Sequence, residues 1–479
     1  MIRQTKIIAT LGPSTTDEGV IRSMIDAGVD LFRYNLSHSS IEAHCEHARI
    51  VRQIAADNKV VGHLFDLPGP KLRIEGFKTG KADLVHGQLF ILDTQWDPKA
   101  GDEKRVGISY QELPGQVASG KRLLIDDGKI VLEVEQATGS EIICRVITEG
   151  VISDRKGFNL EGGGLAAPAL TETDMAYIDI AVRDASPDYF AVSFVSCAAD
   201  VEAARTRVES AGGHAGIIAK IERREALDNL IEIITAADAV MVARGDLGIE
   251  VGDASLPAIQ KYIFHQARLL KKPVIIATQM MESMIASTVP TRAEVFDVAN
   301  AVTSGSDAVM LSAETASGKH PVRVIAKMSE ICLQAEMQPD AKIPERINAV
   351  YDRIDETIAM SAMYAATHFN ARAILALTES GRTALWMSRV TGVTDLPIYA
   401  LTPKQRTCGK VALYRGVHPV EFICDCEHYD EVIRQAIARL VGEGRVNNTD
   451  TVIITKGTLH QQGRTNSIDI LKVNDILSG

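Results

Sequence analysis

Short apolar segments alternate with amphipathic stretches along most of the first 338 residues. The apolar segments are short and rich in β-branched residues, which is typical of buried strands. The stretches between them repeat with the helical period, as in Asp17–Asp26, Ile41–Ala56 and Thr173–Asp184. The predicted strands are Lys6–Leu11, Asp30–Leu36, Val60–Asp66, Tyr189–Phe194, Gly216–Ile221, Ala239–Ala243, Pro273–Thr278 and Ala308–Leu311.

Strands that are apolar on both faces and joined by helices indicate a parallel sheet covered on both sides. Eight consecutive strand–helix units favour a closed (β/α)8 TIM barrel over an open sheet. We assign residues 1–67 and 165–338 to this barrel.

The alternation of strands and helices is interrupted between residues 68 and 164. Short segments with alternating apolar and polar residues, such as Arg122–Asp126 and Ile130–Glu135, are separated there by turn residues. This pattern predicts a small β-barrel domain inserted after the third strand. Gly162–Gly164 returns the chain to the barrel and is suited to a hinge. We therefore expect the insert to act as a lid over the strand ends.

Residues 339–479 show a different alternation of helix and strand. A helix over Asp355–Phe369 leads into a strand at Ala373–Leu377, and further strands are predicted at Ile398–Leu401 and Thr451–Thr455. This order predicts a third, doubly wound α/β domain.

Composition narrows the functional class. The formal net charge of −11 disfavours a nucleic-acid partner, and no apolar run is long enough to span a membrane. The seven cysteines are scattered, and the first residues lead into the strand at Lys6 with no signal-peptide pattern. We therefore expect reduced thiols in a cytoplasmic protein. Cys424, Cys426 and His428 match no strong zinc spacing, so strand packing is the favoured explanation for them.

Polar residues cluster where the predicted barrel strands end, which is where barrel enzymes carry their reactive groups. One charge at a strand end is usually a solvated loop residue, but six strands ending in this way are hard to explain structurally. The residues concerned are Arg33, Asn35, Ser37 and His38 after strand 2, Asp66 after strand 3, Lys220 and Glu222 after strand 5, Arg244–Asp246 after strand 6, Thr278 after strand 7, and Ser312 and Glu314 after strand 8.

Glu222 and Asp246 are candidate ligands of a divalent metal. They lie on adjacent predicted strands, and two facing carboxylates repel unless a cation sits between them. Oxygen ligands favour Mg²⁺ or Mn²⁺ over zinc. The alternative is a purely structural ion-pair network among Lys220, Glu222, Arg244 and Asp246. Arg33, Arg73 and Lys220 are the cations that an anionic substrate would need.

These segments together resemble the pyruvate kinase family nearly from end to end, including the insert and the C-terminal domain. The motifs are Thr5–Pro13 (TKIIATLGP), Arg33–His38 (RYNLSH), Lys220–Glu222 (KIE), Met241–Gly248 (MVARGDLG), Ala277–Met284 (ATQMMESM) and Met310–Thr315 (MLSAET).

The resemblance implies transfer of the phosphoryl group of phosphoenolpyruvate to ADP. Glu222 and Asp246 would bind Mg²⁺, and Lys220 and Arg33 would face the phosphoryl group. The backbone from Ala243 through Arg244 and Gly245 to Asp246, with the Thr278 hydroxyl, would hold the carboxylate. Thr278, Ser312 and Glu314 would organise proton delivery to enolpyruvate. Arg33, Asn35, His38, Arg73 and Lys156 match nucleotide-binding positions.

Two segments depart from the common family pattern. Many members read DTKGPE after the third strand and bind K⁺ with positions equivalent to Asn35, Ser37, Asp66 and Leu67. Here the segment reads DLPGPK, so the ammonium of Lys71 is expected to replace K⁺, as in the K⁺-independent branch.

The second departure is in the loop Thr378, Glu379, Ser380, Gly381, Arg382 and Thr383, where the family binds an allosteric sugar phosphate. Glu379 disfavours a bisphosphate, so we expect a sugar monophosphate or AMP, together with the loop Lys456–Asn466. A helix cap without a ligand is the alternative.

The resemblance also implies a homotetramer. Two rival functions stay open from the residues alone, namely a barrel aldolase or lyase that handles pyruvate enolate on Mg²⁺ and a non-catalytic metabolite sensor.

Overall fold

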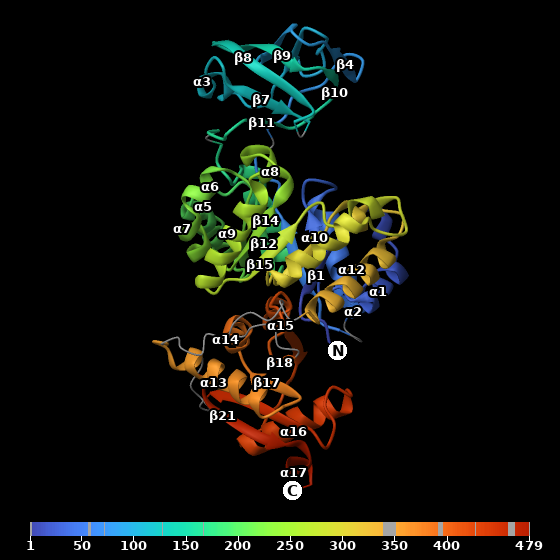
Figure 1. Ribbon diagram of the computed structural model, residues 1–479, viewed down its shortest axis with the longest axis vertical. Coiled ribbons are helices and arrows are strands. Elements are labelled where there is room, and N and C mark those ends of the chain that lie inside the picture. Colours follow the sequence, from blue (N-terminus) through green and yellow to red (C-terminus); the bar gives the residue numbers. More distant parts are fainter. Residues whose placement is uncertain are drawn as a thin grey trace.

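The chain forms a central barrel with a β-rich lid at one end and an α/β domain at the other (Figure 1). The computed structural model describes residues 2–55, 59–70, 72–126, 128–165, 167–338, 351–390, 396–426, 428–457 and 465–478. No helix within these ranges is both long and apolar enough to cross a membrane, and all seven cysteines are free thiols.

The predicted (β/α)8 barrel is confirmed. Eight parallel strands close in the order β1-β16-β15-β14-β13-β12-β3-β2. They are β1 (Lys6–Thr10), β2 (Leu31–Asn35), β3 (Gly62–Asp66), β12 (Tyr189–Val192), β13 (Gly216–Ile221), β14 (Ala239–Ala243), β15 (Val274–Ala277) and β16 (Ala308–Leu311). The elements around them are η1 (Pro13–Thr15), α1 (Glu18–Ala27), α2 (Ile41–Ala55), α4 (Glu172–Asp184), α5 (Ala198–Ser210), α6 (Glu225–Asp228), α7 (Leu230–Ala236), α8 (Arg244–Val251), α9 (Leu256–Leu269), η2 (Glu282–Ile285), α10 (Arg292–Thr303), α11 (Ala313–Ala316) and α12 (Pro321–Glu336).

Each strand divides its side chains between two cores, because successive residues point to opposite faces. In β12, Phe190 and Val192 pack outward in the cluster formed with the surrounding helices. Tyr189 and Ala191 point into the barrel, where they join Ile8, Met241 and other strand residues. Every residue of β12 is buried, which explains why its sequence shows no polar alternation.

Parallel pairing brings the carboxyl ends of all eight strands to one mouth of the barrel, beneath the lid. Asn35 of β2 is opposite Asp66 of β3, and Ile221 of β13 is opposite Val242 of β14. Helix α8 begins at Arg244, directly after β14, so Asp246 lies in its first turn, where a carboxylate is favoured by the helix dipole.

The lid consists of a curved six-stranded sheet (order β11-β7-β8-β9-β5-β6) and a two-stranded sheet (β10-β4) that share one apolar core. Its elements are β4 (Lys81–Leu84), β5 (Leu89–Asp93), β6 (Arg105–Gly107), α3 (Leu113–Gln116), β7 (Arg122–Ile125), β8 (Ile130–Thr138), β9 (Glu141–Thr148), β10 (Gly150–Ser153) and β11 (Phe158–Leu160).

The C-terminal domain is a five-stranded sheet in the order β19-β18-β17-β20-β21, with only β21 antiparallel to its neighbour. The doubly wound order is therefore confirmed, and the predicted start at residue 339 lies outside the described residues. The elements are α13 (Ile354–His368), β17 (Ala373–Leu377), α14 (Arg382–Val390), β18 (Ile398–Thr402), α15 (Gln405–Val411), β19 (Val417–Glu421), α16 (Tyr429–Gly442), β20 (Thr451–Gly457), β21 (Thr465–Lys472) and α17 (Val473–Leu477).

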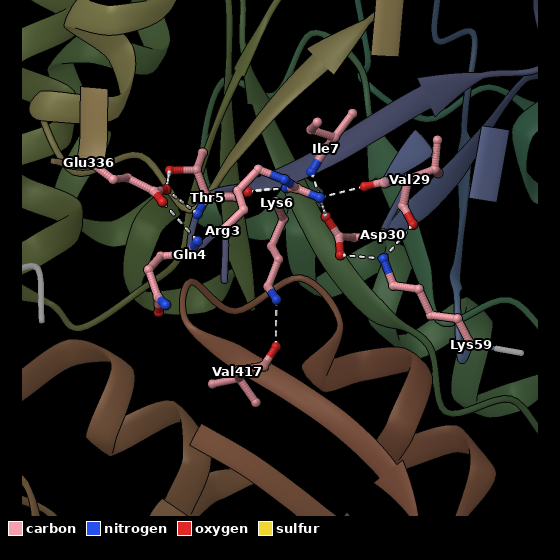
Figure 2. Close-up of polar contacts among 11 residues, drawn as sticks. Arg3, Gln4, Thr5, Lys6, Ile7, Val29, Asp30, Lys59, Glu336 and Val417 are labelled. Atoms are coloured by element: carbon pink, nitrogen blue, oxygen red, sulfur yellow. Dashed lines mark hydrogen bonds and ion pairs between the residues drawn. The ribbon is translucent and has the colours of Figure 1, made fainter. Parts of the chain in front are cut away.

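The C-terminal domain closes the amino end of the barrel, opposite the lid (Figure 1). One apolar cluster runs from the barrel interior into this domain, through residues such as Ile8, Val411 and Val417. Charged residues surround that contact. Figure 2 shows Lys6 reaching from β1 to the main-chain oxygen of Val417, at 2.5 Å, beside the Arg3–Asp30–Lys59 ion pairs.

Candidate active site

Lys220 lies near the carboxyl end of β13, at the mouth of the barrel. Its Nζ lies 3.2 Å from Asp66 Oδ1 and 2.9 Å from Glu222 Oε1, and it donates to Ser193 Oγ at 2.8 Å. These three partners follow three neighbouring strands. Burial alone would lower the pKa of Lys220, but the Asp66 and Glu222 carboxylates outweigh burial and raise it above its ordinary value. Lys220 is therefore a fixed cation.

Arg33 supplies a second cation beside Lys220. Its guanidinium contacts Asp66 Oδ2 at 2.7 Å and donates to Thr10 Oγ1 at 3.1 Å. Burial would raise the pKa of Asp66, but the charges of Lys220 and Arg33 hold it below its ordinary range. Asp66 is 1% exposed, so it orients both cations from beneath while leaving their other faces toward the mouth.

The predicted pair of carboxylates sits on the two neighbouring segments that follow β13 and β14. Glu222 is 2% exposed and accepts a hydrogen bond from the Phe194 amide at 2.7 Å. Asp246 lies in the first turn of α8. Within the described part of the chain, no group of three or more His, Cys, Asp or Glu side chains could form a metal cage. Two carboxylates without a cage fit Mg²⁺, which usually keeps water and substrate oxygens as its other ligands.

The start of α8 is braced against the end of β15. Thr278 has a φ of 68°, unusual for a β-branched residue, and this conformation places its Oγ1 3.0 Å from the Gly245 amide. The Arg244 guanidinium contacts Asp297 of α10 at 2.7 Å and the Thr278 main-chain oxygen at 2.7 Å. The Arg244 side chain therefore holds the α8 turn in place, and it is the backbone of this turn that meets the mouth.

Glu314 is fixed by main-chain amides. Its carboxylate accepts from Ser312 at 2.7 Å and from Met281 at 3.3 Å, and it is 2% exposed. Ser312 follows β16 directly, so both predicted residues lie at the mouth beside the end of β15.

The candidate nucleotide-binding residues come from two parts of the molecule, the barrel and the lid. Asn35 ends β2 and His38 lies in the turn that follows, where Asn35 Oδ1 accepts the Ser37 amide at 3.2 Å. Arg73 and Lys156 lie at the base of the lid, where Arg73 is bridged to Gly157. Lys156 pairs with Asp126 at 2.9 Å, and this bond, aided by Lys129, keeps the pKa of Asp126 below its ordinary range.

The predicted monovalent site is described only in part, because Lys71 lies outside the described residues. Of its other positions, Asp66 is already paired with two cations. The Leu67 main-chain oxygen accepts from Ser193 at 2.7 Å.

The loop Thr378–Thr383 joins β17 to α14, as predicted. Gly381 has a φ of 77° and its amide donates to Thr378 Oγ1 at 3.0 Å. Glu379 is paired with Lys404 at 2.7 Å. The loop lines one side of a hollow of about 1860 Å³ that continues to the barrel. Of the expected partner loop, only Lys456, Gly457, Thr465 and Asn466 are described, and Thr383 contacts Thr465 through their hydroxyls.

Sequence reasoning missed three groups at this mouth. Ser193 and the Phe194 amide bind Lys220 and Glu222, and a serine directly after a predicted strand was an available signal. Asp297 is in the middle of α10, and nothing local to it predicts its pairing with Arg244.

Comparisons with known proteins identify the family of this chain. The family description "Pyruvate kinase, barrel domain" matches residues 2–325, and "Pyruvate kinase, alpha/beta domain" matches residues 356–471. A pyruvate kinase of Buchnera aphidicola is 47% identical, with 98% of this chain and 99% of the relative covered. Pyruvate kinase II of Salmonella typhimurium is 46% identical with the same coverage.

The crystal structure of a pyruvate kinase from Cryptosporidium parvum superposes with a TM-score of 0.90 at 33% identity, covering 98% of this chain and 96% of that one. The family descriptions, the full-length relatives and the shared fold show that this chain belongs to the pyruvate kinase family.

Proposed function

We propose that this enzyme transfers the phosphoryl group of phosphoenolpyruvate to ADP at the carboxyl-end mouth of the barrel, with Lys220 as the central cation. The observation that carries this assignment is the set of three oxygens from three strands that hold the Lys220 ammonium within 3.2 Å. A cation fixed before the substrate arrives stabilises charge on the transferring phosphoryl group without reorganisation cost. Arg33, fixed on Asp66, acts on the same group.

The substrate carboxylate is proposed to bind the main-chain amides at the start of α8, from Ala243 to Asp246, and the Thr278 hydroxyl. Helix amino-terminal amides favour anions. In support, the Gly245 amide donates to Thr278 Oγ1 at 3.0 Å, so the two groups lie close enough for one carboxylate to accept from both once this bond is exchanged.

Glu222 and Asp246 are proposed to hold Mg²⁺ or Mn²⁺, which would polarise the substrate oxygens and neutralise their charge. The chain's own contribution is orientation. The Phe194 amide and Lys220 fix both oxygens of Glu222, and Asp246 lies in the first turn of α8, at the positive end of the helix dipole.

Enolpyruvate must then gain a proton at carbon. We assign this to a relay through Thr278, Ser312 and Glu314, because the two hydroxyls and the amide-held carboxylate lie at the ends of the neighbouring strands β15 and β16.

ADP is proposed to lie between the barrel, with Arg33, Asn35 and His38, and the lid, with Arg73 and Lys156. Residues 68–164 would move as this lid. The Lys156–Asp126 pair is partly exposed, so little free energy is lost when Lys156 leaves Asp126 and pairs with a phosphate of ADP instead.

Pyruvate kinases generally use K⁺ as well as Mg²⁺, and we propose that this enzyme does not require K⁺. Lys71 supplies a positive charge in the segment where K⁺-dependent members carry glutamate. In support, Asp66 is already neutralised by Lys220 and Arg33. Lys71→Glu should create a K⁺ requirement, measured as activity in K⁺-free buffer against buffer with K⁺. Full activity of Lys71→Glu without K⁺ would overturn this proposal.

The loop Thr378–Thr383 is proposed to bind a sugar monophosphate or AMP. Its hydroxyls and Arg382 offer donors for one phosphate, and the charge of Glu379 is offset by Lys404. Candidate effectors titrated against the phosphoenolpyruvate saturation curve test this, and no response to any of them would leave the loop as a helix cap.

We further propose a cytoplasmic homotetramer with barrel and C-terminal contacts. Large apolar side chains are exposed on α10, where Phe296 is 76% exposed, and on α13 and the edge strand β21, with Ile354 at 69% and Ile470 at 48%. Mass measurement in solution tests the assembly, and a monomer would contradict it.

The assignment of the reaction is tested by following pyruvate release from phosphoenolpyruvate with and without ADP. Release that depends on ADP and yields equal amounts of ATP supports it. Release that is independent of ADP would instead indicate lyase-type chemistry.

A further inference from the structure

We propose that Tyr189 is a positioning residue for the phosphoryl transfer, and that it ties Lys220 and Glu222 to helix α15 of the C-terminal domain through strand β12. This inference rests on the roles proposed above for Lys220 and Glu222. Tyr189 stands at the amino end of β12, on the side of the barrel opposite the substrate.

The upper end of β12 holds the reactive groups. Directly after the strand, Ser193 Oγ accepts the Lys220 ammonium at 2.8 Å, and the Phe194 amide donates to Glu222 at 2.7 Å. Phe194 has a φ of 57°, so this turn is strained and depends on its surroundings to keep its shape.

The lower end of β12 is fixed to the C-terminal domain. The Tyr189 hydroxyl donates to the main-chain oxygen of Lys410, near the end of α15, at 2.7 Å. Asp188 packs so closely against Gly409 that a Cβ there would fall 2.1 Å from its Oδ1. Lys410 also pairs with Asp238 at 3.3 Å. A shift of α15 therefore cannot leave Tyr189 in place.

The strand between these two ends is short and buried. Ser193 is four positions after Tyr189, which corresponds to a rise of about 13 Å. Tyr189, Ala191 and Ser193 share one face, and the first two are packed in the barrel interior. Because these side chains are closely packed, a displacement of Tyr189 is transmitted along β12 to Ser193 rather than absorbed by the surroundings.

The other end of α15 meets the loop Thr378–Thr383. Lys404, just before the helix, pairs with Glu379 at 2.7 Å, and Thr407 Oγ1 donates to the Glu379 main-chain oxygen at 2.7 Å. The loop also reaches the end of α15 next to Lys410, where Gly381 packs against Val411. One seven-residue helix thus lies between this loop and the strand that holds Lys220.

A double-mutant cycle on the full-length enzyme tests the proposal. Tyr189→Phe removes only the hydroxyl that reaches α15, and the pair Lys404→Met with Thr407→Val frees the other end of the helix. Tyr189→Phe should lower kcat/KM for phosphoenolpyruvate by about tenfold, because small displacements of a reactive group are costly. The combined variant should lose much less than the product of the two separate losses, since either change already releases α15.

The control cycle pairs Tyr189→Phe with Lys271→Met, which breaks the Lys271–Glu356 bridge between the barrel and α13 without touching α15. In this control, the loss of kcat/KM in the combined variant should equal the product of the two separate losses to within about a factor of two, as for independent sites.

The proposal would be overturned if Tyr189→Phe kept the wild-type kcat/KM, or if the losses in the first cycle also multiplied. If Tyr189→Phe does not fold, Lys410→Met loosens the same end. All of these variants keep Lys220 and Glu222, so a failed cycle leaves the assigned chemistry standing.

Discussion

Replacing the buried Lys6 tests how charge is accommodated between the barrel and the C-terminal domain. Lys6 is 1% exposed, and its ammonium donates to the Val417 main-chain oxygen (Figure 2). Burial lowers its pKa from 10.5 to about 8. Asp30 and Glu336 favour its charged form, whereas Arg3 and Lys59 oppose it. The folded enzyme therefore carries an energetically costly cation at neutral pH.

The size of this cost follows from the difference between 10.5 and about 8, which corresponds to about 3 kcal/mol. Between these pH values the unfolded chain binds a proton that the folded chain has released, so stability rises with pH in this window. Below pH 8 the buried ammonium destabilises the fold by this full amount. About 2.5 kcal/mol of the destabilisation is relieved between pH 7 and pH 10. Lys6→Met has no proton to lose at this position. From pH 7 to pH 10 the free energy of unfolding of the wild type should therefore rise by this amount relative to that of the variant.

The assay is urea unfolding of Lys6→Met and wild type at both pH values. Trp386 reports on the C-terminal domain, and Trp96, the other of the two tryptophans, is replaced by Phe in both proteins. Groups that titrate in both proteins cancel in the difference. A difference in unfolding free energy that stays constant within about 0.5 kcal/mol from pH 7 to pH 10 would refute this account of Lys6.

Two further substitutions probe the lid hinge and the domain junction. Gly163→Ala, at φ 77°, would place a Cβ 2.7 Å from Glu225 Oε1, so we expect the KM for ADP to rise several-fold while that for phosphoenolpyruvate changes little. Gly162→Ala is the matched control, with φ 83° and open space around the new Cβ, and an equal effect there would show that backbone strain alone is responsible. Asp307→Asn leaves the buried guanidinium of Arg389 without its carboxylate and should lower the free energy of unfolding by about 3 kcal/mol in urea titration. A loss below about 1 kcal/mol would mean that the Asp307–Arg389 pair contributes little.

The barrel could be predicted from the sequence because its strands are locally encoded. Gly216–Ile221 is apolar except for Lys220, Ala239–Ala243 is apolar throughout, and the structure has both strands at the predicted limits. The chemistry at the strand ends was visible for the same reason, and family membership decides between the phosphotransferase and the rival aldolase and sensor functions.

Contacts between distant segments could not be predicted in this way. Arg244 meets Asp297 across 53 residues, and the Tyr189 hydroxyl meets Lys410 across 221. Helix α15 is short, and nothing in its sequence shows that it closes the barrel. Likewise Lys6 would be read as a solvated residue at the start of a strand, because only the docked C-terminal domain buries it.

The central claim is that Lys220 is the cation on which phosphoryl transfer depends. The most direct measurement is kcat for ATP formation by Lys220→Met at saturating phosphoenolpyruvate, ADP and Mg²⁺. Lys6→Met serves as the control, since it removes another buried lysine from the opposite end of the same barrel. We predict a fall of at least about 10³-fold for Lys220→Met and a change within about threefold for Lys6→Met. Retention of a tenth or more of wild-type kcat by Lys220→Met would contradict the claim.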